Sequence, residues 1–348
     1  MNALSNAGAP VTEPWMLPDG ENLLFLLGAP RSGTTWLAKI FDSHPRVLYR
    51  HEPDTVLRNE QLPFFCAREE VEAHREEARR YLSRLMNVRT LKSAGSLPLF
   101  PKSYYGALTR RAHDGMVYSL HAANTILRGI QWARRIPIPD MIGRSSNARP
   151  LIVFKSVSSR GRARLFAEAL PKSRIIFILR HPCGQVASTM KGMQSGKFER
   201  TAAFRAVLKT EEGRNLGLTA DEFAKLSPLE QCAWHWAILN QKALNDLSDL
   251  EGDRVKVLRY EDACSSPEET ARELFSFSGL DWNSQTAHFI RQSTTGPETE
   301  DFYSTNRNPL SAANRWRNSL SARDQQQVME IATHVPAGKI FASARPPI

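Results

Sequence analysis

Cysteine is scarce and scattered in this chain of 348 residues. The four cysteines, Cys66, Cys183, Cys232 and Cys264, form no Cys-x-x-Cys pair and have no histidine tract beside them. A structural zinc site and a disulfide framework both need cysteines in close or regular spacing, so this distribution argues against both. We therefore expect a protein that needs no bound metal.

Long apolar runs are also absent. The strongest run near the N-terminus, Leu23 to Leu27, is far shorter than the roughly 20 residues that cross a bilayer. A signal peptide would require a basic residue near the N-terminus, but no basic residue precedes Arg31. We expect a cytoplasmic protein without a transmembrane segment, and peripheral membrane contact stays open. Residues 1–20 contain Gly, Pro and Asn without periodicity, which predicts a flexible leader.

Negative charge is in the minority: 46 Lys and Arg residues against 36 Asp and Glu residues give a net charge of +10. This balance favours polyanionic ligands, such as phosphorylated cofactors and acidic glycans. The basic residues are dispersed and no nucleic-acid recognition motif is present, so a nucleic-acid-binding module is the least favoured interpretation.

Short apolar runs of strand length alternate with helical patterns along the chain. A continuous apolar run is typical of a strand that is buried on both faces of a parallel sheet. The alternation predicts an α/β fold, with a P-loop-type parallel β-sheet flanked by helices. Strands are expected at residues 22–28, 150–155, 174–180 and 255–259, and helices at residues 34–43, 69–86, 162–170, 184–191, 228–249 and 267–278.

Residues 53–149 interrupt this alternation. The segment is rich in Arg, Lys, aromatic residues and Pro, and it predicts a mostly helical insertion that shapes a substrate cleft. No internal repeat and no linker rich in Gly, Ser or Pro divides the chain. Residues 21–348 are therefore expected to form a single domain.

The segment Gly28-Ala29-Pro30-Arg31-Ser32-Gly33-Thr34-Thr35-Trp36-Leu37 follows the first expected strand and opens an apolar helix. The backbone N–H groups of such a loop, together with the positive end of the helix dipole, can surround a phosphate. Thr34 stands where the nucleoside triphosphatase pattern requires Lys, so the usual grip on the β- and γ-phosphates is missing. The alternative is a structural turn in which Gly33 only permits a tight bend.

A second window lies at the end of the third expected strand. Arg180 is followed by His181 and Pro182, and Ser188 stands eight residues beyond Arg180 on the next expected helix. A guanidinium fork and a hydroxyl are both good donors to a phosphate. Arg180 by itself is more often a solvated cation at a strand end, but its combination with the first loop favours a phosphate ligand.

The two windows closely resemble the sulfotransferase superfamily, whose members use 3′-phosphoadenosine 5′-phosphosulfate (PAPS). The resemblance spans about residues 22–335, and His181 departs from it because the family usually has Asp there. Fixed cations can suffice for transfer of a sulfuryl group, so no metal is required. The resemblance implies that the 5′-phosphosulfate is held by Arg31, Ser32, Gly33, Thr34, Thr35 and Trp36, with Arg31 also catalytic, and that the 3′-phosphate is bound by Arg180 and Ser188. It further implies that Lys155, 25 residues before Arg180, stabilises the leaving oxygen.

Transfer to a hydroxyl also needs a base. In the glycan and tyrosine branches of the family a glutamate after the second strand has this role, which implies Glu52, just beyond a short strand at residues 47–49. Pro53 moves Glu52 away from the helical region, which suits a side chain presented from a strand end. His51 is the rival, because the phenol and steroid branches use a histidine and an imidazole suits neutral pH. A surface ion pair with a nearby arginine is the structural alternative for Glu52.

The C-terminal third carries weaker matches. We interpret Tyr260 and Glu261 as polar groups that hold the end of the sheet. Residues 300–320 resemble the loop that covers the cofactor in the family. In the alternative interpretation, Trp316 is a core anchor that leads into a helix at residues 321–332. The residues implied to contact the cofactor are Arg315, Trp316 and Arg317.

The sequence thus predicts a PAPS-dependent sulfotransferase that acts on a hydroxyl of a carbohydrate or glycolipid, by in-line displacement with Glu52 as general base. Sulfation of tyrosine, or of a small alcohol or phenol, is the alternative within the family. A P-loop kinase or NTPase is the alternative from another class, and it would need a loop Lys and a strand-end Asp for Mg²⁺. Those positions hold Thr34, Lys155 and Arg180.

Overall fold

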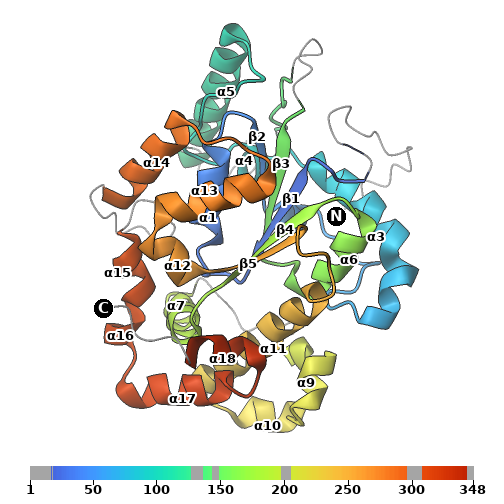
Figure 1. The fold of residues 1–348 in the computed structure, drawn as a ribbon, viewed down its shortest axis with the longest axis vertical. Coiled ribbons are helices and arrows are strands. Elements are labelled where there is room, and N and C mark those ends of the chain that lie inside the picture. Colours follow the sequence, from blue (N-terminus) through green and yellow to red (C-terminus); the bar gives the residue numbers. More distant parts are fainter. Residues whose placement is uncertain are drawn as a thin grey trace.

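A parallel β-sheet organises the protein in the computed structural model, which describes residues 17, 19–126, 136–142, 149–196, 205–295 and 308–342. Five strands lie in the order β2-β3-β1-β4-β5, and every neighbouring pair is parallel (Figure 1). The predicted α/β fold is confirmed. The strands are β1 (Leu23–Gly28), β2 (Val47–His51), β3 (Leu151–Ser156), β4 (Arg174–Leu179) and β5 (Val255–Arg259).

The central strands are apolar because both faces of the sheet are covered. All six residues of β1 are buried. Phe25 and Leu27 pack in one core cluster, while Leu24 and Leu26 pack in the other, as the alternation of side chains along a strand requires. The prediction from the continuous apolar run, that both faces of the sheet are buried at this strand, is therefore confirmed.

Helices cover the two faces in separate groups (Figure 1). One face carries α1 (Thr34–Asp42), α12 (Tyr260–Ser265), α13 (Pro267–Ser278) and α14 (Ser284–Thr295). The other carries α3 (Val71–Met86) and α6 (Ala163–Ala169), which pack against each other. The remaining helices nearer the C-terminal half are α7 (Pro182–Gln194), α9 (Glu211–Asn215), α10 (Ala220–Lys225), α11 (Pro228–Leu247), α15 (Pro309–Asn314), α16 (Trp316–Ser319), α17 (Ala322–Ala332) and α18 (Pro336–Ala342).

The insertion between β2 and β3 is mostly helical where the structure describes it. Its longest helix, α5 (Ala107–Ile126), lies at one end of the long axis of the molecule, whereas α10 and α17 lie at the other (Figure 1). The short elements of the insertion are α2 (Pro53–Val56), η1 (Arg68–Glu70) and α4 (Leu91–Ala94), and two further 3₁₀ turns outside it are η3 (Arg160–Arg162) and η4 (Val207–Lys209).

Element boundaries differ from the prediction mainly at prolines. The helix expected at residues 184–191 begins two residues earlier, at Pro182, because proline suits the first turn of a helix, where its missing N–H costs no hydrogen bond. The strand expected at residues 47–49 continues to His51. Glu52 then adopts φ 45° and ψ 49°, so Pro53 excludes the right-handed helical region but leaves Glu52 in the left-handed region rather than extended.

Candidate functional site

The phosphate loop joins the end of β1 to the first turn of α1. Gly33 has φ 84° and precedes Thr34, the first residue of the helix. Ser32 is fully buried, and its Oγ donates to the carbonyl of Ala29 over 2.7 Å, which closes the loop on itself. The first N–H groups of a helix have no acceptor inside it, so those of α1 are available to an anion.

Tyr260 supports this loop from α12. A Cβ atom placed on Gly33 would lie 2.2 Å from the Tyr260 ring, so only glycine fits between the ring and the loop. The Arg180 guanidinium lies 4.8 Å from the centre of the same ring. Tyr260 therefore packs beneath two of the predicted phosphate ligands, beyond the sheet-end role expected of it.

Arg31, Arg180 and Ser188, three predicted cofactor ligands from the two windows, converge here. Arg31, at φ 71°, donates from Nε to Ser188 Oγ over 2.8 Å. Arg180 donates from Nη1 to the Arg31 carbonyl over 2.6 Å and from Nη2 to the Ala312 carbonyl over 2.9 Å. Three residues that are up to 157 positions apart in the chain thus form one cluster.

The predicted base lies at the ends of β2 and β3. Glu52 forms an ion pair through Oε1 with the Lys155 ammonium, and Lys92 Nζ, from α4, lies 3.0 Å from Glu52 Oε2. Burial by itself would raise the pKa of Glu52, but Lys155, His51 and Lys92 together outweigh it and lower the pKa to about 2. Burial lowers the pKa of Lys155, against the opposing effect of Glu52. Sequence reasoning missed Lys92, because it belongs to a short helix without a pattern of its own.

His51, the rival base, is bonded elsewhere. Its Nδ1 lies 2.7 Å from the Tyr49 hydroxyl. Burial, followed by the Lys155 charge, lowers the pKa of His51 to about 3, so the imidazole is neutral at physiological pH. Glu52, in contrast, has its carboxylate beside Lys155, the residue implied to assist the leaving oxygen. Both roles remain predictions.

Asp54 ties the end of β3 to the insertion. Its Oδ2 accepts hydrogen bonds from Ser156 Oγ over 2.5 Å and from Ser159 Oγ over 2.7 Å. Burial outweighs these bonds and raises the pKa of Asp54. The network holds the loop that follows Lys155, and sequence analysis gave no sign of it because the partners are about a hundred residues apart.

The C-terminal candidates take more structural positions. Trp316 is 7% exposed, and its ring stacks on His181 at 4.4 Å with an interplanar angle of 14°. Arg317 lies over the Trp316 ring at 4.8 Å and donates to Asn314 Oδ1. This packing matches the core-anchor interpretation of Trp316, and cofactor contacts by Trp316, Arg317 and Arg315, the residue between α15 and α16, remain predictions.

Glu261 has a contact at the sheet end, where it reaches the residues that follow β4. Its Oε1 accepts the backbone N–H of His181 over 3.0 Å. The other expected segments are only partly in view: most of residues 1–20 and residues 300–307 lie outside the described part of the chain.

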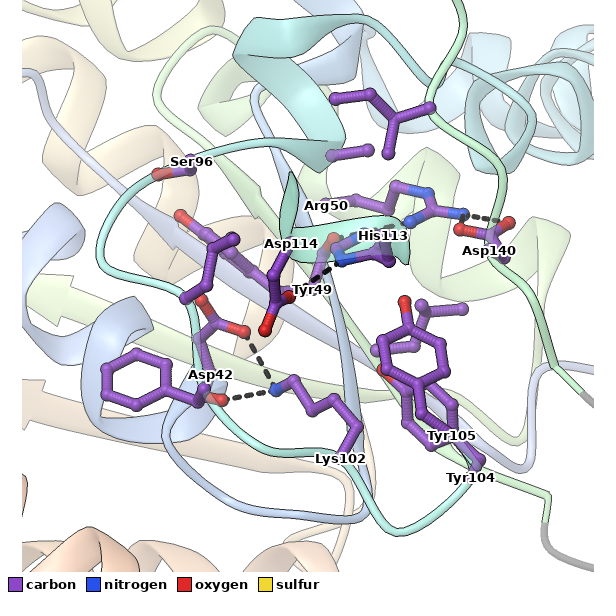
Figure 2. Close-up of a pocket in the computed structure, with 15 residues that line it drawn as sticks. Asp42, Tyr49, Arg50, Ser96, Lys102, Tyr104, Tyr105, His113, Asp114 and Asp140 are labelled. Carbon is purple, nitrogen blue, oxygen red and sulfur yellow. Dashed lines mark hydrogen bonds and ion pairs between the residues drawn. The ribbon is translucent and has the colours of Figure 1, made fainter. Parts of the chain in front are cut away.

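A polar cavity of about 40 Å³ lies beside the outer edge of β2, where the insertion covers the sheet (Figure 2). A water molecule needs roughly 10–15 Å³ of such volume, so the cavity has room for only a few. Figure 2 shows the Arg50 guanidinium directed at the Asp140 carboxylate, to which Nη2 donates over 2.6 and 2.7 Å, and Lys102 directed at Asp42. None of the predicted catalytic residues lines this cavity. Its ion pairs, Arg50 with Asp140 and Lys102 with Asp42, join the insertion to β2 and to the end of α1.

The described residues contain no group of three or more His, Cys, Asp or Glu side chains that could hold a metal ion. None of their helices is both long and apolar enough to span a membrane.

Comparison with known proteins gives a family match over most of the chain. The model of the family described as "Sulfotransferase family" matches residues 24–284, which is 261 of 348 residues. Carbohydrate sulfotransferase 5 of Mus musculus is 32% identical over 106 residues, which cover 29% of this chain and 27% of that protein. Carbohydrate sulfotransferase 1 of Mus musculus is 37% identical over 67 residues, which cover 19% of this chain and 16% of that protein. The chain therefore spans less than a third of the length of these relatives.

Among solved structures, the sulfotransferase domain of the Synechococcus PCC 7002 olefin synthase aligns with a TM-score of 0.46 and 18% identity, over 93% of this chain and 95% of that one. The mouse sulfotransferase SULT7A1, complexed with 3′-phosphoadenosine 5′-phosphate (PAP), aligns with a TM-score of 0.42 and 13% identity, over 93% of this chain and 89% of that one.

Proposed function

The chain belongs to the sulfotransferase family, and on that basis we propose that it transfers a sulfuryl group from PAPS to a hydroxyl of a carbohydrate or glycolipid. The observation that carries the proposal is the convergence of two clusters at the carboxyl ends of neighbouring strands. Arg31, Arg180 and Ser188 gather beyond β1 and β4, and Glu52 and Lys155 meet beyond β2 and β3. The partial matches to carbohydrate sulfotransferases support a glycan acceptor over tyrosine or a phenol.

The residues of the phosphate loop fit the PAPS phosphates. Arg180 Nε is a buried donor that has no acceptor among the described residues, and Nη1 of the same guanidinium donates to the Arg31 carbonyl in the loop before α1. A buried guanidinium donor of this kind is suited to a phosphate oxygen. We assign the 5′-phosphosulfate to residues 31–36 and the 3′-phosphate to Arg180 and Ser188. When bound, PAPS supplies the sulfuryl group and a phosphate leaving group.

Glu52 is the proposed acceptor of the hydroxyl proton. Its carboxylate is ionised at neutral pH, because its pKa is held at about 2 by the two lysines despite burial. A carboxylate with so low a pKa is a weak base. Any movement of the Lys155 ammonium from Glu52 toward a phosphate oxygen would remove one of the opposing charges and raise the Glu52 pKa. The pair can thereby couple stabilisation of the leaving group to activation of the base.

Calorimetric titration with PAP, in parallel with ATP and Mg²⁺, tests the cofactor. We expect micromolar or tighter binding of PAP and little affinity for ATP, because the loop has Thr34 where a triphosphate grip needs Lys. Preference for ATP, or binding of neither nucleotide, would contradict the proposed function.

Replacement of Arg180 by Ala should weaken PAP binding by about 10- to 100-fold, since a hydrogen bond to a charged group contributes roughly 1.5–3 kcal/mol. The loss has two sources, the phosphate contact and the hold on the Arg31 carbonyl. Arg174→Ala, at the opposite end of the same strand, is the matched control and should leave PAP affinity unchanged. Equal affinity of Arg180→Ala and the control would remove Arg180 from the proposed site.

A further inference from the structure

Arg160 is a buried cation, and two of its three guanidinium nitrogens have no acceptor in the described part of the chain. It begins the turn η3, four residues after the end of β3, and is 4% exposed. Its Nε and Nη1 atoms are buried and have no hydrogen-bond acceptor among the described residues. Native proteins leave few buried polar groups unsatisfied, so this guanidinium calls for an explanation.

Two neighbouring arginines have a carboxylate or aromatic rings beside their charge, although Arg162 Nε, like two nitrogens of Arg160, is buried without an acceptor among the described residues. Arg164 donates to Glu168 Oε1 over 2.7 Å, and Arg162 lies over the rings of Tyr81 and Phe166 at 5.5 and 5.3 Å. Arg160 instead has the imidazole of His235 nearby, whose pKa is lowered to about 3 by burial and by the Arg160 charge. Burial lowers the pKa of Arg160 to about 10. A buried charge without a partner is costly, and an anion would relieve that cost.

The fold places Arg160 on the side of the proposed base. Lys155 lies in β3 and Arg160 follows that strand, and Ser159 between them is bonded to Asp54, two residues beyond Glu52. The residues assigned to the cofactor phosphates come instead from β1, β4 and the helices that follow them. An anion at Arg160 therefore belongs to the half of the sheet edge formed by β2 and β3, which Glu52 and Lys155 share.

We propose that Arg160 forms an oxyanion subsite for the acceptor, which takes a sulfate, phosphate or carboxylate group carried by the molecule that is sulfated. This inference rests on the proposed function for its acceptor, but the anion site itself can be tested without turnover. The planar fork of a guanidinium matches two oxygens of such a group. The proposed glycan would accordingly be an acidic one.

Thermal unfolding with sodium sulfate as the probe tests the subsite. The protein is first saturated with PAP, so that the phosphate loop is filled, and sulfate is compared with sodium chloride at equal ionic strength. We expect sulfate to raise the Tm of the wild type by about 2 °C or more beyond its effect on Arg160→Met, because binding to the folded state stabilises it. Sulfate also stabilises proteins by exclusion from their surface, so the difference between the two proteins is the measured quantity.

Arg164→Met is the matched control, because it removes an arginine of the same segment that already has carboxylate partners. It should keep the full wild-type response to sulfate. Arg160→Met should have a Tm in chloride at or above that of the wild type, since it removes an unpaired buried charge. Equal sulfate responses of wild type and Arg160→Met would overturn the subsite.

PAP affinity shows whether Arg160 binds an anionic group of the acceptor or a phosphate of the cofactor. Arg160→Met should bind PAP as the wild type does, and a loss as large as that of Arg180→Ala would overturn the assignment to the acceptor. If the wild type bound no PAP, the proposed function would fail, yet the sulfate comparison without PAP would still test Arg160. In the wild type itself, sulfate should shift the His235 imidazole resonances in NMR spectra, and unchanged resonances would also contradict the subsite.

Discussion

Replacement of Glu52 by Gln should lower the rate of sulfuryl transfer by about 10²- to 10⁴-fold, the usual contribution of a positioned general base. Gln keeps the size of the side chain but cannot take a proton at neutral pH. PAP affinity should change much less, because the proposed phosphate ligands come from the ends of β1 and β4 rather than from β2. The measurement is transfer of radiolabelled sulfate from PAPS to a panel of glycans and glycolipids, with PAP calorimetry on the same protein.

His51→Gln is the control that separates the two candidate bases. It should retain most of the activity, since the His51 imidazole is bonded to Tyr49 while the Glu52 carboxylate lies against Lys155. An active Glu52→Gln protein together with an inactive His51→Gln protein would exchange the two roles. Glu72→Gln, on the exposed surface of α3, controls for loss of an acidic charge without a site.

Replacement of Asp140 by Ala should lower the free energy of unfolding by about 3–5 kcal/mol, the usual result of breaking a buried ion pair from one side. The Arg50 side chain is 1% exposed and the Asp140 side chain 8% exposed, and two hydrogen bonds join them. Without the carboxylate, the guanidinium beside the cavity of Figure 2 would stay buried with its charge uncompensated. Urea denaturation measures the change.

The double variant Arg50→Met with Asp140→Leu distinguishes charge from packing. It should recover most of the lost stability, because apolar residues of similar volume can replace a buried ion pair at little cost. Asp281→Ala, which removes an exposed pair with Arg46 at 3.8 Å, should cost less than about 1 kcal/mol. A similarly small cost for Asp140→Ala would show that the insertion is not held to the sheet by this pair.

The fold was largely readable from local patterns. The apolar runs of β1, β3 and β4 and the helices between them predicted a parallel sheet, because burial on both faces removes polar residues from a strand. Element ends were less accurate: the expected start of α7 at Gly184 missed Pro182, and the expected end of β2 missed two residues.

The candidate site also has one part that local sequence predicts and another that depends on contacts between distant residues. The phosphate loop is a local object, since a strand, a Gly-bounded turn and a helix start lie within about ten residues, so its sequence suffices to predict it. Glu52 and Lys155 were singled out by resemblance, but their contact joins residues 103 positions apart. Lys92 and the Asp54 network carry no sequence signal, because single polar residues in an irregular segment look alike.

The sequence by itself determined the fold class, the phosphate loop and the family resemblance, because each depends on side-chain periodicity or on residues close together in the chain. Only the tertiary structure decided that Lys155 and Lys92 hold the Glu52 carboxylate, that Asp140 compensates Arg50, and that Arg160 is buried with unsatisfied donors. Burial and charge pairing depend on which distant segments the sheet brings together, and these contacts set the pKa and the cost of each buried group.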